Sequence, residues 1–592
     1  MRVLPSRVLP CLFAIAFGIL TPHLNAQNGN VSNQKTGVPK VATWMNFRGS
    51  TSGVTSARLP SRFQADNVAW KSALPGRGAS TPIVVGNKII TTAFSGFGES
   101  AENPGTLDAL RHHVLCFDAD TGKLLWQRNI KGNIAVNKRV SENLRGHGFA
   151  SSTPASDGES IFVFFGVSGV FAFDLDGEFL WQNDVGWKDD NFGSSSSLTV
   201  YGNKLIVNAS IESDSVYAFD TKSGRGIWKI DDVFRSWSTP VVGRSQAGRQ
   251  ELVIVQKDIV RGFDPETGVE LWTCEGIHDY IVPSPVFDQG IVYLNGGKQS
   301  RTVAIKLGGL GDVTETHRLW EARYGANVGS SIVFNGLVFN TLENGIVQCY
   351  DAKSGKVLKR ERIKGAGVVY GSPTIVPGVG QQSAQLLVPL TGNGVAVLEA
   401  NANLKFVGYN VFASDPSDVK ASLTVSGERF ITRSEKYLYC IARPKTKTVT
   451  HELDTDATQV DVASADKYDF DAKTGRVRVY NRALEFDPEK LVTFILYSYN
   501  SVLTETQKVK FREYVLENTD AFLNLRKRRA EIHWQHLTQV PKLRSTEALA
   551  KSLGTLETET MATQRDIRNV IKKQFTPEQL AEHLGESKAA KR

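Results

Sequence analysis

Cysteine, methionine and long apolar segments are all scarce in this sequence. Its 592 residues include only 5 cysteines and 3 methionines, which excludes a disulfide scaffold. The apolar run Cys11–Leu20 is too short to span a bilayer. A strong charge of one sign is also missing, because a formal net charge of +8 over so long a chain does not indicate a nucleic-acid-binding protein. Glycine, by contrast, occurs 52 times, which favours many tight turns over a helical bundle.

The first residues have the order of a secretory signal peptide. Arg2 and Arg7 precede the apolar run, and small or tolerated residues follow it up to Ala26. We therefore expect a signal peptide over residues 1–26, a flexible segment over 27–44, and an exported mature protein, periplasmic or extracellular, without a transmembrane segment. Cys11 stands at the start of the apolar run rather than after it, so a lipid anchor on that residue is not expected.

An internal repeat dominates residues 116–440. A copy reads small residue, aromatic residue, Asp, a turn that ends in Gly, and a Trp four residues later. The clear copies are Cys116–Trp126, Ala172–Trp181, Ala218–Trp228 and Gly262–Trp272, and weaker copies stand at Ala304 with Trp320, at Cys349, at Val397 and at Cys440. The seven intervals between these copies average about 46 residues, the length of a four-stranded propeller blade.

The repeat has the chemistry of a β-hairpin. The Asp side chain can accept hydrogen bonds from N–H groups of the turn, and Gly supplies the positive φ before the next strand. The Trp then stands on the outermost strand, where its ring can fill the wedge between neighbouring blades. The aspartates in this role are Asp118, Asp174, Asp220, Asp264 and Asp351, and the tryptophans are Trp126, Trp181, Trp228, Trp272 and Trp320.

A second recurring element, a small-residue start to a β run, precedes each hairpin. Its eight copies begin at Ser80, Ser152, Ser194, Ser238, Ser284, Ser330, Ser372 and Ser422. The eighth hairpin lacks its own Trp strand, whereas a strand around Trp70 precedes the first blade with no hairpin of its own. We therefore predict a mainly β fold: an eight-bladed propeller over residues 45–445 in which the N-terminal strand closes the last blade. Trp70 should then lie beside Cys440.

The repeat also accounts for three of the cysteines. Cys116, Cys349 and Cys440 occupy the position that other copies fill with Ala or Gly. We interpret them as small buried hydrophobic residues, and equivalent positions of different blades are too far apart for a disulfide.

The pattern small-x-Asp-x-x-Thr-Gly-x-x-x-Trp resembles the tryptophan-docking motif of the pyrroloquinoline-quinone (PQQ) propeller family. That family has a quinoprotein dehydrogenase branch, which holds PQQ and calcium at the propeller axis, and a cofactor-free branch that includes the outer-membrane assembly lipoprotein. The dehydrogenase branch typically has two adjacent cysteines, and this sequence has no Cys-Cys pair. Its usual calcium ligands and catalytic Asp have no matching positions here either. The resemblance therefore favours the cofactor-free branch, with PQQ and calcium as the alternative.

The residues just before each small-residue start should converge on one face of the propeller axis. Three arginines, two histidines and three aromatic residues among them suit an anionic or ring-bearing ligand. This candidate binding set is Arg77, Arg145, His147, Arg235, Trp237, His278, Tyr280, Asn327 and Tyr370. These side chains could equally just plug the centre of the ring. Two long segments of the first blade, 93–113 and 129–150, either shape a binding mouth or are tolerated decoration.

Other constellations do not predict catalysis or a metal site. His112 and His113 are neighbours on an extended segment and should point in different directions, and His533 and His536 lack a supporting carboxylate or Cys pattern. No GxSxG, HExxH, CxxC, P-loop or EF-hand pattern is present. We therefore assign no catalytic residue and no metal ligand.

The amino-acid composition changes after the predicted propeller. We expect a β-containing linker over residues 446–485 and a helical domain over 486–592, with helices at 489–503, 505–530 and 557–573 and with Thr504 and Thr576 as N-caps. Leu503–Gln507 and Phe575–Gln579 resemble the LTxxQ motif of periplasmic helical chaperones and stress sensors. The physical content of that motif is a capping box. The basic run Arg526–Arg529 reads as a solvated helix face.

Together these features predict an exported, non-catalytic propeller of the bacterial cell envelope that acts as a binding or scaffold protein. Its partner would be a protein or a small anionic or aromatic ligand at the axial face, and not a nucleic acid; association with the envelope is an open option. The alternative is a PQQ-dependent oxidoreductase of the alcohol or sugar dehydrogenase type.

Overall fold

The computed structural model describes residues 44–49, 53–55, 67–100, 104–133, 147–186, 188–297, 300–378, 383–392, 394–411, 415, 417–442, 448–453, 459–462, 469–471 and 476–478, and residues 504, 506, 507 and 509. The chain comprises two compact units, 1–40 and 41–592, and all described residues lie in the second. The predicted signal peptide, residues 27–43 of the predicted flexible segment, and the C-terminal helices apart from those four residues lie outside the described residues.

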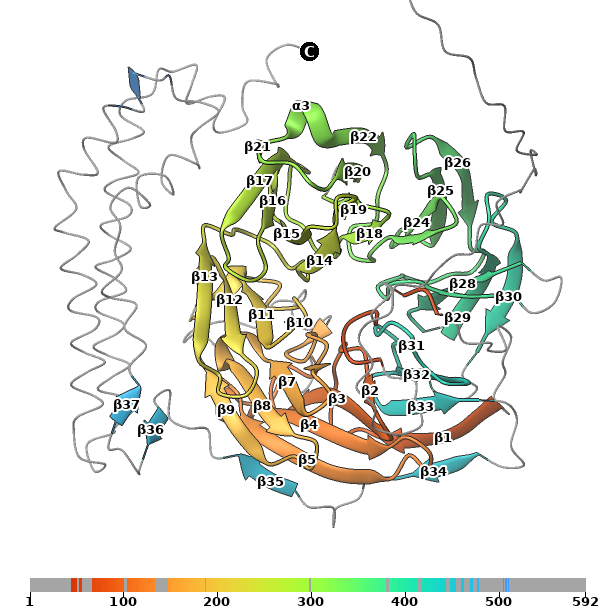
Figure 1. Cartoon of the computed structure of the whole chain (residues 1–592). Helices are drawn as coiled ribbons and strands as arrows, with labels where there is room; N and C mark the ends of the chain where they lie inside the picture. Colours follow the sequence, from red (N-terminus) through yellow and green to blue (C-terminus); the bar gives the residue numbers. More distant parts are fainter. Residues whose placement is uncertain are drawn as a thin grey trace, which may run out of the picture. The chain divides into compact units, whose positions relative to one another are not determined.

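Within the described residues, eight antiparallel blades follow one another around a ring (Figure 1). Blades 1 to 4 contain, from the innermost strand outward, β2 (Ile83–Val85), β3 (Lys88–Ser95), β4 (Arg111–Asp118) and β5 (Leu124–Lys131); β6 (Ala155–Ser156), β7 (Ser160–Phe164), β8 (Val170–Asp174) and β9 (Phe179–Asn183); β10 (Thr199–Tyr201), β11 (Lys204–Ala209), β12 (Ser215–Asp220) and β13 (Gly226–Asp231); and β14 (Val241–Arg244), β15 (Gln250–Val255), β16 (Ile259–Phe263) and β17 (Glu270–Glu275).

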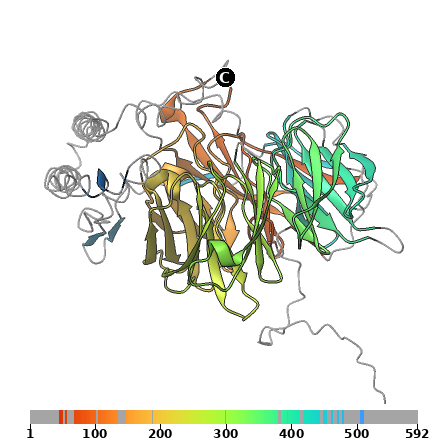
Figure 2. The same ribbon diagram turned by 90° about the horizontal axis from the view of Figure 1, so that it is seen from above.

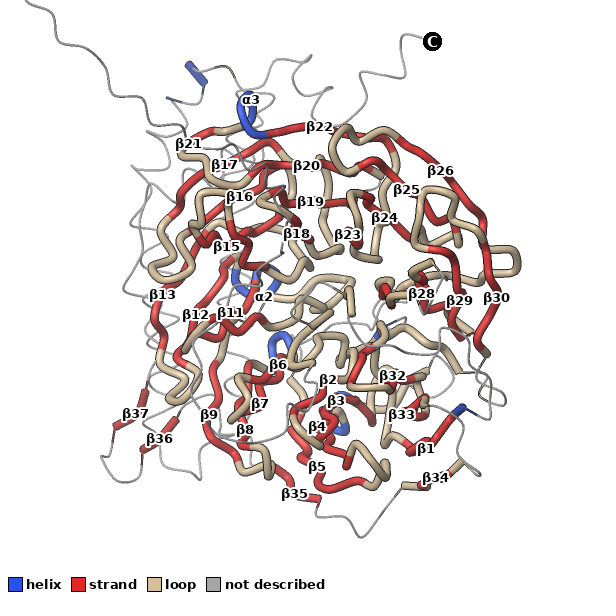
Figure 3. The backbone as a smooth tube through the Cα atoms, turned by 45° about the vertical axis from the view of Figure 1, so that its right-hand side comes forward, coloured by secondary structure: helices blue, strands red, loops and turns tan. Residues whose placement is uncertain are grey.

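Blades 5 to 8 repeat the order with β18 (Val286–Asp288), β19 (Ile291–Gly296), β20 (Arg301–Lys306) and β22 (Arg318–Arg323); β23 (Ile332–Phe334), β24 (Leu337–Thr341), β25 (Ile346–Asp351) and β26 (Val357–Arg362); β27 (Thr374–Val376), β28 (Gln385–Leu390), β29 (Gly394–Glu399) and β30 (Phe406–Asn410); and β31 (Thr424–Ser426), β32 (Arg429–Arg433), β33 (Tyr437–Ile441) and β1 (Val68–Ala73). Helical turns are few and short in this part of the chain (Figure 3): η2 (Leu107–Ala109), η3 (Gly166–Ser168), α2 (Ser210–Ser213) and α3 (Thr314–His317).

The two faces of the ring differ in what they carry. Because the strands alternate in direction, the Asp-containing hairpins all lie on one face, which we call the hairpin face. The segments that lead into the innermost strands lie on the opposite face, the loop face; Figure 2 shows the blades from the side. The apolar core lies between blades, since one cluster joins residues of blades 7, 8 and 1, for example Val397, Phe430 and Phe117.

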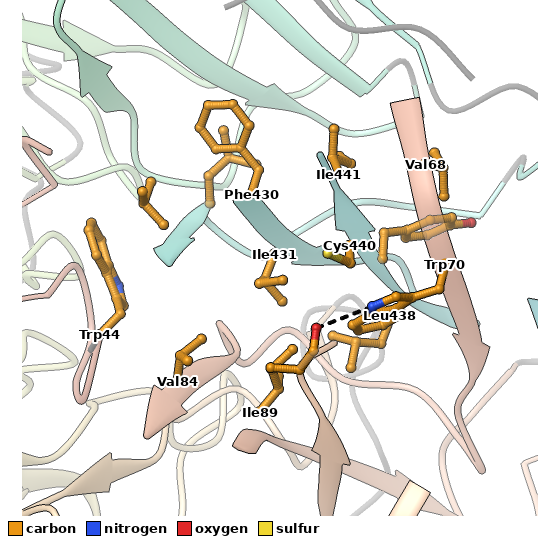
Figure 4. Packing of buried hydrophobic residues seen from close by; sticks show 14 of the residues in the cluster. Trp44, Val68, Trp70, Val84, Ile89, Phe430, Ile431, Leu438, Cys440 and Ile441 are labelled. Carbon is orange, nitrogen blue, oxygen red and sulfur yellow. Dashed lines mark hydrogen bonds between the residues drawn. The ribbon is translucent and has the colours of Figure 1, made fainter. Parts of the chain in front are cut away.

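The ring is closed by its first strand, as the sequence predicts. β1 pairs antiparallel with β33, and Trp70 lies opposite Cys440 in that ladder (Figure 4). The Trp70 side chain is 2% exposed, and its Nε1 donates a hydrogen bond to the carbonyl of Ala119 in blade 1 at 3.3 Å. One strand therefore joins the last blade to the first through both backbone and side-chain contacts.

A closed circle of eight hydrogen bonds joins the starts of the innermost strands. In each blade the backbone N–H of a Ser or Thr donates to the hydroxyl oxygen of the corresponding residue in the next blade, at 2.9 to 3.2 Å. The members of this hydroxyl belt are Thr81, Thr153, Ser197, Thr239, Ser284, Ser330, Ser372 and Ser422, and Ser422 donates back to Thr81. The small-residue starts thus have a physical reason, because only a short hydroxyl side chain reaches one strand across.

The hairpin chemistry is confirmed as well. Asp118 Oδ1 accepts hydrogen bonds from the backbone N–H of Asp120 and Thr121, and Gly122 has a φ of 79°. Asp174, Asp220, Asp264 and Asp351 accept bonds from their turns in the same way. The Trp ring of the preceding blade rests on the turn glycine, where any Cβ would be too close: at Gly122 it would lie 2.4 Å from the Trp70 ring.

Trp272 departs from this pattern. Trp126, Trp181, Trp228 and Trp320 donate to a carbonyl of the following blade, as Trp70 does, whereas Trp272 Nε1 donates to the buried Glu251 carboxylate of its own blade at 2.6 Å. Blade 5 lacks the Asp–Gly hairpin that would receive the ring, since β21 (Gly311–Asp312) and α3 occupy that connection.

Several boundaries differ from the sequence-based ones. β3, β4 and β5 extend into the two long segments expected in blade 1, so that the described residues of these segments outside strands are 96–100, 104–110, 132–133 and 147–150. Within the expected linker, β34 (Val449–His451) pairs parallel with β1, β35 (Gln459–Val462) pairs parallel with β5, and β36 (Asp469–Asp471) pairs with β37 (Arg476–Arg478). β34 and β35 therefore add fifth strands on either side of the ring closure.

The cysteines and the capping box follow the sequence-based interpretation. Cys116, Cys274, Cys349 and Cys440 are buried, and no disulfide joins them. Thr504 N–H donates to Gln507 Oε1 at 2.9 Å, and Gln507 N–H donates back to Thr504 Oγ1 at 3.3 Å, which is the reciprocal pair of a capping box. Thr576 lies outside the described residues.

Candidate functional site at the loop face

Three aromatic side chains meet where the chain enters blades 3, 4 and 5. The ring centroids of Phe192 and Trp237 are 6.0 Å apart, those of Trp237 and Tyr280 are 5.9 Å apart, and those of Phe192 and Tyr280 are 6.1 Å apart. Trp237 is buried, whereas Phe192 is 37% exposed. We call these residues the aromatic triad; edge-to-face contact between the rings holds the exposed one in place.

Two hydrogen bonds to backbone carbonyls fix the position of Trp237 in the triad. Trp237 Nε1 donates to the Gly193 carbonyl at 2.7 Å, and the Trp237 N–H donates to the Ile281 carbonyl at 2.8 Å. These bonds join the segments that enter blades 3, 4 and 5, so the three rings form one rigid surface instead of three separate loop side chains.

Polar groups surround the triad. The exposed guanidinium of Arg235 lies 6.0 Å from the Trp237 ring centroid, which is the outer range of a cation–π contact. Asn327 Nδ2 donates to the Tyr280 hydroxyl at 3.2 Å, while its Oδ1 is buried without a hydrogen-bond partner. Burial raises the pKa of Glu343, although that carboxylate accepts the N–H of Asn327 at 2.6 Å. The site thus offers a cation, apolar rings and an unused acceptor.

A small cavity adjoins the triad toward blades 1 and 2. It has a volume of about 30 Å³, enough for about two water molecules. Among the residues that line it are His112, Ser151, Asp189, Gly193 and Ser194. Since Gly193 also accepts the Trp237 indole bond, the cavity and the triad share one segment of backbone.

The groups around this cavity have strongly shifted pKa values. Burial raises the pKa of Glu212 to about 7, even though Ser194 donates a hydrogen bond to its carboxylate. Burial lowers the pKa of His112 to about 3 and that of His147 to about 4. Both imidazoles are therefore neutral near pH 7, and His147 Nδ1 lies 2.7 Å from Ser151 Oγ. Glu212 itself does not line the cavity, but it accepts a hydrogen bond from Ser194, which does.

A charged cluster lies where blades 8 and 1 meet. The Glu435 carboxylate accepts Arg77 at 2.6 Å and Lys420 at 2.5 Å. Burial alone would raise the pKa of Glu435, but these two cations hold it below its usual value. The charge of Lys420 also contributes to the low pKa of His147, so this cluster adjoins the histidine side of the cavity.

The structure therefore groups some members of the candidate binding set and separates others. Trp237 and Tyr280 belong to the triad, and Arg235 and Asn327 lie beside it. His147 bonds Ser151 of the cavity lining, and Arg77 belongs to the charged cluster. His278 is exposed and faces Asp258 at 3.0 Å and Glu275 at 3.3 Å instead, and Tyr370 is exposed and stands apart from the triad's ring contacts. Arg145 lies outside the described residues.

Sequence reasoning missed several residues of this region. Phe192 precedes Ser194 just as Trp237 precedes Ser238, so the rule that selected the other residues could have found it. Lys420 stands two residues before Ser422, so the same rule could have found it too. Glu212 carries no such signal, because the short helix α2 brings it here. His112 and His113 do point in different directions: His112 Nε2 bonds Ser168 at 2.9 Å, and His113 Nε2 bonds Ser95 at 2.8 Å.

The described residues offer no cluster of three acidic side chains for a calcium ion. Calcium takes six to eight oxygen ligands, yet the described residues contain no group of three His, Cys, Asp or Glu side chains that could hold a metal ion. The four cysteines of blades 1, 4, 6 and 8 are isolated from one another. In the same part of the chain, no helix combines the length and apolar character needed to cross a membrane.

These features define a class: an eight-bladed β-propeller built from PQQ-like repeats. Residues 110–361 match the profile of a family described as outer membrane protein assembly factor BamB, so the resemblance of the repeats to that propeller family is confirmed over this range. No curated protein matches the chain in sequence.

The solved structures that are similar to the chain include the following three. BamB from Moraxella catarrhalis is 14% identical with a TM-score of 0.44, covering 64% of this chain and 98% of that one. The computationally designed Ika8 protein is 13% identical with a TM-score of 0.40, covering 62% and 98%. A europium-containing methanol dehydrogenase is 12% identical with a TM-score of 0.38, covering 60% and 90%.

Proposed function

We propose that this chain is an exported, non-catalytic binding propeller of the bacterial cell envelope. It takes an anionic, ring-bearing group, free or carried by a partner protein, at the aromatic triad. Support for export comes from the N-terminal order of charged, apolar and small residues. The matched family is described as an outer-membrane assembly factor, which agrees with a role in the envelope.

The aromatic triad with Arg235 carries the proposal. Phe192 presents an exposed ring on a rigid backing, and the exposed Arg235 guanidinium stands beside the Trp237 ring. An aromatic face and an adjacent cation are the groups that bind a planar anion through stacking and charge together.

The test compares two double variants of the protein isolated from its own host. F192A/R235A removes the exposed half of the site and leaves the buried Trp237 in place. H278A/Y370A is the matched control, since both side chains are exposed on the same face but lie outside the site. Mass spectrometry of co-purifying small molecules and proteins should find a component that is lost only from F192A/R235A. A component that both variants retain equally would show that the site is wrong.

The quinoprotein alternative has its own test. PQQ and calcium added to the purified chain should leave its tryptophan fluorescence unchanged and produce no dye reduction with an alcohol or a sugar. Saturable PQQ binding together with substrate-dependent dye reduction would replace the binding proposal with an oxidoreductase.

A further inference from the structure

The chain enters the interior of the ring before its first strand begins. Trp44 pairs with Val84 on the innermost strand of blade 1, with N–H···O distances of 3.0 and 2.9 Å, and Figure 4 shows these two residues side by side. The carbonyl of Met45 accepts the N–H of Ser156, on the innermost strand of blade 2, at 2.9 Å. Residues 44 and 45 therefore lie against the inner wall.

A later part of the same segment, residues 53–55, lies at blade 7, which is separated from blade 1 by blade 8. Val54 pairs with Ile375 on the innermost strand of blade 7, Thr55 N–H donates to the Ile375 carbonyl at 2.9 Å, and Ile375 N–H donates to Gly53 at 3.0 Å. Residues 44 and 45 thus lie against the inner strands of blades 1 and 2, and residues 53–55 lie against the inner strand of blade 7.

Arg48 lies between these two parts of the segment in the sequence and is almost fully buried. It is 4% exposed, and its Nε, Nη1 and Nη2 all lack a hydrogen-bond partner. Its Nη2 lies beside Gly53, where an added Cβ would be 3.1 Å from that nitrogen and 3.1 Å from the Pro373 carbonyl. Burial lowers the pKa of Arg48 to about 9, so the guanidinium remains a cation at neutral pH.

A buried cation without a counter-charge is costly. Desolvation of an ion is offset only by an opposite charge and by hydrogen bonds to its donors, and Arg48 has neither among the described residues. Arg433 is another buried arginine, and its contacts differ from those of Arg48. It donates from Nε to the Ser434 carbonyl at 3.1 Å and from Nη1 to the Thr92 carbonyl, while its Nη2 lacks a hydrogen-bond partner. The fold thus supplies acceptors to two donor atoms of Arg433 and to none of Arg48.

Two further polar atoms of the segment also lack a hydrogen-bond partner. Trp44 Nε1 and Asn46 Oδ1 are buried without a hydrogen-bond partner, and the Trp44 ring packs on Gly49 in the same turn. The guanidinium presents a planar fork of donors that matches the two oxygens of a carboxylate or phosphate. Water could accept hydrogen bonds from the N–H groups of Arg48, but it could not balance the positive charge of the guanidinium.

We propose that Arg48 binds an oxyanion, a carboxylate or a phosphate, inside the ring and next to the inner strands of blades 6 and 7. This anion is separate from the ligand of the aromatic triad, because Arg48 belongs to the N-terminal segment and not to the loops of blades 3 to 5. The site makes the N-terminal segment and the propeller into one anion-dependent unit.

The experiment measures the thermal midpoint of the full-length chain in inorganic phosphate and in acetate, at constant ionic strength. We expect the Tm of the wild type to rise with the logarithm of the concentration of at least one anion, and the arm that responds identifies its source. R48M should show a flat profile. R433M, the matched buried-arginine control, should keep the response even where its own Tm is lower.

A second measurement does not depend on the variants' folding. Desalted wild-type chain is unfolded in guanidinium, and ion chromatography quantifies the oxyanions that it releases. About one equivalent per chain is expected. Release of no oxyanion together with an anion-independent wild-type Tm would overturn the proposal and leave water as the partner of Arg48, and equal loss of response in R48M and R433M would overturn the assignment to Arg48.

Discussion

Trp70 and Cys440 face each other in one antiparallel ladder although they come from the two ends of the propeller sequence. The Trp70 indole then reaches past its own blade to the Ala119 carbonyl of blade 1. Three segments, β1, β33 and the hairpin of blade 1, therefore meet at this side chain.

Replacing Trp70 with Ala should destabilise the protein by about 3–5 kcal/mol, the usual cost of removing a buried large aromatic side chain. Trp70 is 2% exposed, so the substitution would leave a buried cavity that the neighbouring side chains can fill only in small part. Urea unfolding measures the loss. W228A is the control, because Trp228 makes the same kind of indole bond but is only partly buried; a loss in W228A as large as in W70A would contradict a special role of the closure.

The hydroxyl belt gives a second prediction. S284A leaves the buried N–H of Thr239 without an acceptor, and an unsatisfied buried donor costs about 1–3 kcal/mol. S238A is the matched control, since the Ser238 hydroxyl is equally buried but has no hydrogen-bond partner. Its effect on the free energy of unfolding should stay within about 0.5 kcal/mol. Equal effects of the two variants would show that the belt adds no stability.

The fifth strand β34 should protect β1 from exchange with solvent. T450P interrupts the parallel pairing of Thr450 with Lys71, because Pro cannot donate to a ladder. Amide hydrogen exchange of β1 should then accelerate while that of the inner strands stays unchanged. E452P, just beyond the strand, serves as the control, and unaltered β1 exchange in T450P would mean that β34 contributes no protection.

Glu212 should make stability fall as pH rises. Its pKa is raised to about 7 in the fold from an ordinary value of 4.5, so the folded state binds more protons than the unfolded state between these values. The free energy of unfolding therefore decreases across pH 4.5 to 7, by about 3 kcal/mol in all.

His112 and His147 act in the opposite direction over part of this range, because burial lowers their pKa values. The prediction is therefore tested as a difference: wild type should lose stability relative to E212Q as pH rises from 4.5 to 7. A difference that stays constant with pH would show that Glu212 ionises normally in the fold.

The blades were predictable because their determinants are local. Asp118 and Gly122 are within one hairpin, and the Trp that rests on such a glycine recurs at a fixed spacing. Trp272 was not predictable in the same way, since its bond to Glu251 follows from the absence of a hairpin in the next blade.

The site was predictable only in part. Trp237 and Tyr280 are positioned by their distance from the start of an inner strand, whereas His278 turns outward because Asp258 and Glu275 compete for its ring. Glu212 and Arg48 are brought to their places by contacts between segments far apart in the chain. No local pattern marks either residue.

The eight hydrogen bonds of the hydroxyl belt all run in the same direction around the ring. Each blade donates a hydrogen bond to the next blade and accepts one from the blade before it. A circuit of this kind has no first member. A circular permutant of the propeller that opens at another inter-blade connection would still contain the complete circuit.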